Sequence, residues 1–277
     1  MVDSGGILLA ARDYGGNGHP PLLLLHGSGD TLATWDEVAA LLTSSFRVVA
    51  YDAPGHGHSQ ASHEGPRLSH FLDAVDDVVA ALRLERPILV GHSMGGGVAL
   101  FRAAERSGTR AVISIDAAYA REPSDPPPVH AGEEEIRAAG FGRTMTAEEL
   151  DRMCEALPAG PAQTNLRRAH RLRPDGRFER RPSAAFVLAM SGFAAPLEAE
   201  VTEDELYSAI GCPTLLVCGE HGWIQGKPLT DKLRRRVNAL PARFPHIELV
   251  WLDAGHMIHW ERPRELVAVI TAFAQRN

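Results

Sequence analysis

Short continuous runs of hydrophobic residues alternate with longer segments of helical periodicity along most of the chain. The continuous runs are typical of strands that are buried on both faces of a parallel sheet. Such strands are predicted over residues 22–25, 47–51, 87–90, 111–115, 213–218 and 247–252. Apolar residues recur every three or four positions in the amphipathic helices predicted over residues 34–44, 69–84, 94–106, 230–240 and 263–274. This alternation favours an α/β fold with a mostly parallel central sheet and helices on both faces.

One long segment, residues 118–208, interrupts the alternation. It opens with a proline-rich stretch and continues with shorter helical patterns, so we expect a helical cap insertion that lies over the edge of the sheet. The expected core domain then comprises residues 1–117 and 209–277. The apolar residues of the insertion either line a substrate pocket or form its own small core: Phe141, Met145, Met153, Leu157, Phe186, Met190 and Phe193.

An arginine-rich stretch runs from Arg167 to Arg181 within the insertion. We expect most of these side chains to form a solvated face. The alternative is that one of them binds a carboxylate or phosphate group of a substrate.

Charge and composition narrow the class of protein. The chain has 277 residues and a net charge of −7, which argues against general nucleic-acid binding. Its three cysteines have neither a disulfide nor a zinc spacing, so buried, reduced thiols are expected. We expect no signal peptide and no membrane partner, because the apolar runs are too short to cross a bilayer. The sequence therefore favours a cytoplasmic protein and leaves its oligomeric state open.

The most informative motif is Gly91-His92-Ser93-Met94-Gly95. It lies between a predicted strand and a predicted helix, which is the context that a nucleophile elbow requires. Flanking glycines permit a sharp backbone turn that a Cβ atom would block. The motif predicts that the Ser93 hydroxyl is held above the end of the sheet, at the N-terminus of the following helix.

A serine hydroxyl is a weak nucleophile and needs a general base and donors for the oxyanion. His256 is the predicted base, because it follows the last predicted strand in a small glycine-flanked loop. His259 is expected to be a packing residue instead. The predicted oxyanion donors are the backbone N–H groups of Met94, directly after the nucleophile, and Ser28, in the glycine-rich loop after the first buried strand.

These motifs together resemble those of α/β-hydrolase-fold proteins, in particular the branch of small esterases, lactonases and cofactor-free haloperoxidase-like enzymes. The matching pieces occur in the order of the family: His26-Gly27, then residues 52–59 (DAPGHGHS), residues 91–96 (GHSMGG) and Gly255-His256-Met257. The resemblance implies a Ser93 nucleophile, a His256 base and an oxyanion hole made by Ser28 and Met94.

The chain departs from the family at the expected acid. The family usually carries Gly-Glu-x-Asp after the strand before the last, whereas this sequence has glycine at position 222 in Gly219-Glu220-His221-Gly222. Asp116, at the end of the predicted strand next to the elbow strand, is one candidate acid. Glu220 is an alternative, and the third possibility is an incomplete triad.

The sequence predicts a serine hydrolase that cleaves a carboxylic ester, lactone or thioester through an acyl-enzyme, with a small substrate bearing an apolar acyl or lactone group. Two other functions stay open: carbon–carbon bond cleavage or ring opening and closing at the same site, and ligand binding or sensing with little catalysis. No cofactor is expected. No metal is expected either, because Asp52, His56 and His58 have a poor spacing for zinc.

Overall fold

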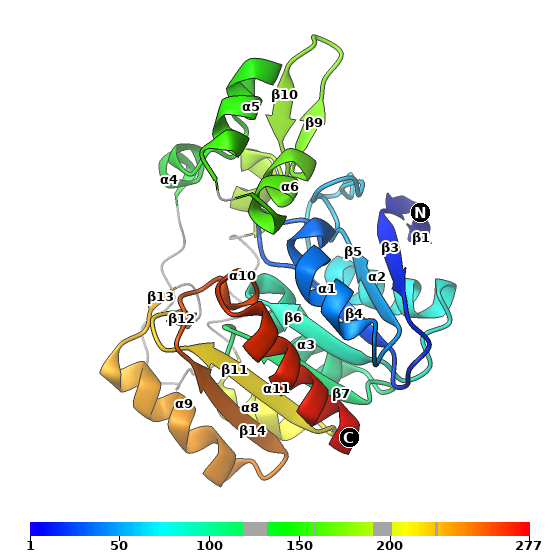
Figure 1. The fold of residues 1–277 in the computed structure, drawn as a ribbon, viewed down its shortest axis with the longest axis vertical. Coiled ribbons are helices and arrows are strands. Elements are labelled where there is room, and N and C mark those ends of the chain that lie inside the picture. The colour runs from blue at the N-terminus through cyan, green and yellow to red at the C-terminus, as the bar shows by residue number, and fades with distance from the viewer. Residues whose placement is uncertain (119–131, 158, 191–200, 225–226) are drawn as a thin grey trace.

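A seven-stranded sheet runs through the core of the protein (Figure 1). The computed structural model describes residues 1–118, 132–157, 159–190, 201–224 and 227–277. The strand order is β14-β11-β7-β6-β4-β5-β3. The strands are β3 (Ala11–Gly15), β4 (Leu22–Leu25), β5 (Val48–Tyr51), β6 (Ile88–His92), β7 (Ala111–Ile115), β11 (Thr214–Gly219) and β14 (Ile247–Leu252). All neighbours pair in parallel except β3, which is antiparallel to β5, so the predicted mostly parallel α/β fold is confirmed.

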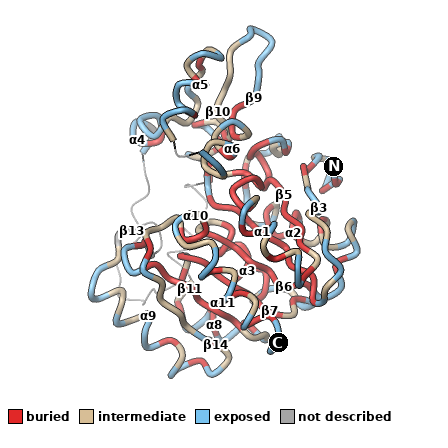
Figure 2. Tube along the Cα trace, in the orientation of Figure 1, coloured by how far each residue is buried: buried red, intermediate tan, exposed pale blue. Residues whose placement is uncertain are grey.

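Helices cover both faces of this sheet. One face packs against α2 (Leu68–Ala81), α3 (Met94–Glu105), α8 (Glu203–Ala209) and α9 (Asp231–Arg243). The other face packs against the 3₁₀ turn η1 (Leu32–Trp35), α1 (Asp36–Leu42), α10 (Ile258–Glu261) and α11 (Pro263–Arg276). The sheet and the inner faces of the helices form the buried centre of the molecule (Figure 2).

The strand β4 shows why the apolar runs are continuous. Leu23 and Leu25 belong to one hydrophobic cluster, whereas Leu22 and Leu24 belong to the cluster on the opposite face. Side chains alternate between faces along a strand, so a strand covered on both sides needs apolar residues at every position. Each leucine buried in this way stabilises the fold by about 1.5–3 kcal/mol.

The last part of the inserted segment, α8, packs against α3, whereas the described part of residues 132–190 lies beyond the carboxyl ends of the strands (Figure 1). This part contains α4 (Glu133–Ala138), β8 (Thr144–Met145), α5 (Ala147–Glu155), α6 (Pro161–Arg168), β9 (His170–Leu172), β10 (Phe178–Arg180) and a helical stretch over residues 184–190. The three strands form a small antiparallel sheet in the order β8-β10-β9. Neither this sheet nor α6 is anticipated by the hydrophobic pattern.

The apolar residues of the inserted segment divide between several environments. Met145 packs with Leu150 and Cys154 in a small local cluster. Phe186 and Met190 instead join the main core, and Met153 is exposed. Phe193 lies outside the described residues.

Two short pairs of strands lie outside the sheets described above. The N-terminus forms a hairpin of β1 (Val2–Ser4) and β2 (Ile7–Leu9), and β12 (Trp223–Ile224) pairs with β13 (Lys227–Pro228). All three cysteines are free thiols, and Cys154 and Cys218 are buried, as predicted. Among the described residues, none of the helices combines the length and the hydrophobicity that crossing a membrane would require.

Candidate active site

The backbone at Ser93 has the strained geometry that the motif predicts. Ser93 lies between β6 and α3 with φ +51° and ψ −120°, a region that a residue with a side chain rarely occupies. Its N–H donates to the carbonyl of Ile115 at 3.0 Å, which fixes the turn against β7. The hydroxyl-bearing residue is half-buried rather than enclosed.

Two glycines make this turn possible through close backbone contacts. A Cβ atom at Gly91 would lie 2.2 Å from the carbonyl oxygen of Gly95. A Cβ atom at Gly95 would lie 2.3 Å from the carbonyl oxygen of Leu25, at the end of β4. Larger residues at either position would therefore push α3 away from the sheet.

The imidazole of His256 meets a buried carboxylate. His256 lies in the loop between β14 and α10, and Asp116 follows the last residue of β7. His256 Nδ1 and Asp116 Oδ2 are 2.6 Å apart, and the side chain of Asp116 is 1% exposed. The other carboxylate oxygen accepts a hydrogen bond from the backbone N–H of Gly219 at 2.9 Å. An ionised carboxylate can only accept, so this contact makes Nδ1 the protonated nitrogen and leaves Nε2 as an acceptor.

Position 222 explains why a carboxylate at residue 116 fits here. A Cβ atom at Gly222 would lie 2.3 Å from Asp116 Oδ1 and 2.5 Å from Oδ2. The Asp116 carboxylate thus occupies the space that a side chain at position 222 would need. Asp116 itself has a φ of +48°, which directs it from the end of β7 into this space.

The alternative acid, Glu220, lies elsewhere. It is exposed, and its carboxylate groups with the exposed side chains of His221 and Asp253. His221 and Asp253 are 3.3 Å apart in this surface group. Of the two acids that the sequence left open, Asp116 is the one that the fold brings to His256.

The glycine-rich loop after β4 lies directly against the elbow. A Cβ atom at Gly27 would be 3.3 Å from Ser93 Cβ, and Asp30 N–H closes a tight turn onto the Gly27 carbonyl at 3.2 Å. Ser28 is exposed within this turn. Met94 is the first residue of α3, so its N–H is one of the donors that the helix cannot satisfy internally. The two predicted oxyanion donors therefore belong to segments on either side of Ser93.

His92 is a part of this arrangement that the sequence did not reveal. Its Nε2 donates to the carbonyl oxygen of His256 at 2.9 Å, and the two ring centroids are 4.6 Å apart. The contact ties the loop that carries His256 to the elbow strand. Its only sequence signal is its place immediately before the nucleophile.

Several histidines form a buried layer beneath the site. His259 is fully buried, with Nε2 2.8 Å from the hydroxyl of Thr34, which agrees with its expected packing role. Burial lowers the pKa of His56 and of His259 to about 3, and it also lowers the pKa of His26 and His92. These rings are therefore neutral near pH 7.

The pKa of Asp30, which lies in the loop over the elbow, is raised rather than lowered. Burial raises the pKa of Asp30 to about 6, against the opposing effects of a hydrogen bond from Asn165 and the nearby charges of Arg180 and His256. Its carboxylate therefore changes charge in mildly acidic solution.

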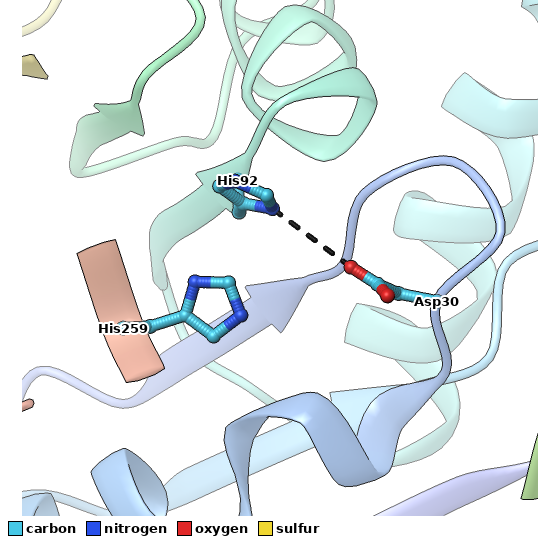
Figure 3. Close-up of side chains that lie close together, drawn as sticks. All are labelled: Asp30, His92 and His259. Atoms are coloured by element: carbon cyan, nitrogen blue, oxygen red, sulfur yellow. Dashed lines mark ion pairs between the residues drawn. The ribbon is translucent and has the colours of Figure 1, made fainter. Parts of the chain in front are cut away.

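Two groups of described residues could offer three ligands to a metal ion. One contains Asp30, His92 and His259 (Figure 3), and the other is the exposed group of Glu220, His221 and Asp253. In the first, His92 Nδ1 and Asp30 Oδ2 are 4.0 Å apart. Ligand atoms of a tetrahedral zinc site lie about 3.3 Å from one another. The 4.0 Å separation in the first group is longer than this, whereas His221 Nε2 and Asp253 Oδ1 in the second group are 3.3 Å apart. The ligand atoms of each group all lie within 4.8 Å of one another.

Comparison with known proteins agrees with this architecture. The profile of the family described as "alpha/beta hydrolase fold" matches residues 20–263. The crystal structure of E-2-(acetamidomethylene)succinate hydrolase superposes with a TM-score of 0.74 and 22% identity, covering 99% of this chain and 97% of that one. At this identity the likeness concerns the fold alone.

Curated relatives match over a shorter stretch. An uncharacterized protein of Mycobacterium tuberculosis is 41% identical over 81 residues, which are 29% of this chain and 24% of the relative. A bifunctional esterase/perhydrolase of Acinetobacter calcoaceticus is 36% identical over 93 residues, which are 33% of this chain and 34% of the relative. The matches thus span about a quarter to a third of the length of these relatives. The family profile, by contrast, covers most of this chain. The chain belongs to the α/β-hydrolase fold family.

Proposed function

We propose that this protein is a serine hydrolase of carboxylic esters, including lactones and thioesters, with Ser93 as nucleophile, His256 as general base and Asp116 as the orienting acid. The observation that carries the proposal is the 2.6 Å contact between His256 Nδ1 and the buried Asp116 carboxylate, at the sheet end that also holds the strained Ser93 turn. The similarity to an esterase/perhydrolase supports the same class of reaction.

The proposed reaction begins with proton transfer from the Ser93 hydroxyl to His256 Nε2. Because Asp116 accepts from Nδ1–H, it orients the ring and stabilises the imidazolium that forms. The serine oxygen attacks the carbonyl carbon, and the negative charge moves onto the carbonyl oxygen. The N–H groups of Met94 and Ser28 are the proposed donors to this oxyanion, and each such donor contributes about 3–4 kcal/mol in comparable sites.

Collapse of the tetrahedral intermediate breaks the bond to the leaving group. His256 returns its proton to the departing alcohol, thiol or ring oxygen, and an acyl-Ser93 ester remains. A water molecule then gives its proton to His256 and attacks the acyl carbon. Breakdown of the second intermediate releases the acid and restores the Ser93 hydroxyl.

The test is the Ser93→Ala variant, assayed with a neutral p-nitrophenyl ester. We expect turnover to fall by about 10³-fold or more, because the nucleophile is lost while binding groups remain. The control is Ser69→Ala, since Ser69 is exposed on α2 and should leave turnover unchanged. Circular dichroism and thermal unfolding of both variants should match the parent protein.

Product analysis completes the test. Hydrolysis gives an acid together with the alcohol, the thiol or, from a lactone, the hydroxy acid. Turnover that persists in Ser93→Ala would refute the nucleophile, and products of carbon–carbon cleavage or ring closure would assign the site to another reaction of this fold.

A further inference from the structure

One arginine reaches from the inserted segment to the loop over the elbow. Arg180 is the last residue of β10, and its Nη2 atom lies 3.3 Å from the position of a Cβ atom at Gly29. The ring of Phe141 also lies against Gly29. Gly29 belongs to the same tight turn as Ser28, the proposed oxyanion donor.

The guanidinium of Arg180 is held firmly, and Asp30 is the acid whose charge acts on it. It stacks over the Phe141 ring, with Cζ 4.2 Å from the ring centroid, and Nη1 donates to the carbonyl of Ala139. Its Nε is buried without a hydrogen bond, and within the described residues no carboxylate lies at ion-pair distance. Withdrawing a cation from water is costly unless an anion or several acceptors compensate for the lost hydration.

Asp30, the nearest acid on this loop, is engaged elsewhere. Its Oδ1 accepts a hydrogen bond from Asn165 Nδ2 at 2.8 Å, and its Oδ2 faces His92 Nδ1 at 4.0 Å. The charges of both Arg180 and His256 act on the Asp30 carboxylate. Arg180 and the proposed base therefore both lie near the Asp30 carboxylate.

The loop after β4 contacts both Ser93 and Arg180, so its length limits the distance between these two residues. Gly27 lies against Ser93, and Gly29 lies against Arg180. Two residues of chain span at most about 7 Å when fully extended, and the tight turn keeps Gly27 and Gly29 closer than that. A small substrate whose carbonyl carbon is attacked by Ser93 is long enough to present a second group to Arg180.

We propose that Arg180 binds a carboxylate of the substrate, so that the preferred esters carry one anionic end a short chain away from the scissile bond. This inference rests on the proposed hydrolase function and names its substrate class. It adds a carboxylate to the expected apolar acyl or lactone substrate. A guanidinium recognises that group through charge-assisted hydrogen bonds, which are stronger than hydrogen bonds between neutral groups.

The test compares esters that differ in one charge. The p-nitrophenyl half-esters of succinic and glutaric acid place the carboxylate on the acyl side, and the p-nitrophenyl esters of butyric and valeric acid are neutral matches. The pair 4-acetoxybenzoate and its methyl ester places the carboxylate on the leaving group instead. Comparing kcat/KM within each pair shows which side of the ester Arg180 contacts.

We expect Arg180→Gln to lower kcat/KM for the anionic ester of one pair by about 10- to 100-fold. The neutral esters should change by less than about threefold, and Arg180→Lys should keep part of the preference because it keeps the charge. Arg173→Gln is the matched control, since Arg173 is exposed in the same hairpin and pairs with Asp175. Equal losses on charged and neutral esters, or no preference for charge in the parent protein, would overturn the proposal.

A binding measurement separates this proposal from the hydrolase function. Calorimetric titration of the Ser93→Ala variant with monomethyl glutarate and with neutral dimethyl glutarate should show tighter binding of the anion, and adding Arg180→Gln should abolish the difference. If Arg180-dependent binding occurs but no ester is hydrolysed, the subsite stands and the proposed reaction falls. If Ser93-dependent hydrolysis occurs without any effect of Arg180 on anion binding or on charge preference, the reaction stands and the subsite falls.

Discussion

At the scale of single residues, the site carries its proposed acid at position 116 and a glycine at position 222. The usual place of the family's acid holds glycine in this chain, and the carboxylate of Asp116 fills the volume beside it. Gly222 leaves room for the Asp116 carboxylate, because a side chain at position 222 would collide with this group, which contacts His256.

Replacing each candidate acid tests this arrangement. Asp116→Asn should lower kcat for a neutral ester by about 10³- to 10⁴-fold, because an amide cannot hold the tautomer of His256 that accepts the serine proton. Glu220→Gln should change kcat by less than about threefold, since Glu220 is exposed in a separate surface group. Steady-state kinetics at pH 7.5 provide the measurement, and a larger loss in Glu220→Gln would move the acid to residue 220.

The sequence could predict some of these residues and not others. Ser93 and His256 lie in local motifs that make them candidates from the sequence alone. The choice between Asp116 and Glu220 depends on which strand end lies beside the His256 loop, and therefore on the pairing of β7 with β6 and of β11 with both β7 and β14. The roles of Arg180 and Gly29 depend on how the inserted segment docks, which no local pattern encodes.

At the scale of elements, α6 shows how the inserted segment attaches to the core. Asn165 is buried, and its Oδ1 accepts from both the N–H and the hydroxyl of Thr31, each at 2.8 Å. Its Nδ2 donates to Asp30. Three residues along, Arg168 forms an ion pair at 2.8 Å with Asp52, whose side chain is fully buried. A polar helix is thus held by buried hydrogen bonds rather than by an apolar stripe.

This attachment predicts a specific loss of stability. Asn165→Ala should lower the free energy of unfolding by about 1–3 kcal/mol, because it leaves the Thr31 N–H without its partner in a buried place. Urea unfolding followed by circular dichroism measures the change. The control is Thr164→Ala, which removes a side chain from the exposed face of the same helix and should cost less than about 0.5 kcal/mol. Equal effects of the two substitutions would contradict the anchoring role of Asn165.

The hydrophobic pattern predicted the elements that are strongly apolar and missed those that are short or polar. The strands β4 to β14 of the main sheet fall within a residue or two of the predicted runs, since each is apolar at almost every position. The strands β9 and β10 are three residues long and rich in charge, and α6 carries no apolar stripe, so pattern reasoning did not detect them. The helix α6 is held by hydrogen bonds between Asn165 and the core, and β9 and β10 by their pairing with each other.

At the scale of the whole molecule, the buried histidines couple folding to pH. His26, His56, His92 and His259 are at most 1% exposed, and burial lowers the pKa of each below that of a free imidazole, to about 3 for His56 and His259. The unfolded chain therefore binds more protons than the folded one between about pH 6.5 and 3. Their contribution to stability is present above pH 6.5 and is lost as the pH falls. Asp30, with its raised pKa, offsets part of this loss.

The expected result is acid unfolding between about pH 6 and 4. Each such histidine contributes about 1.4 kcal/mol per pH unit to the slope, so the free energy of unfolding should fall by roughly 3–5 kcal/mol per pH unit there. Urea titrations at several pH values measure the slope. His56→Gln should reduce it by about one proton, whereas His63→Gln, at an exposed position, should not. A stability that stays constant from pH 7 to pH 5 would contradict these neutral, buried rings.

The central claim is that the strained turn presents an activated serine to a substrate carbonyl. Its most direct test is mass spectrometry of the intact protein after reaction with a fluorophosphonate, followed by peptide mapping. We expect a single adduct on Ser93 that is absent from Ser93→Ala and forms far more slowly in His256→Ala. An adduct on another residue, or ester hydrolysis by a protein whose Ser93 stays unlabelled, would contradict it.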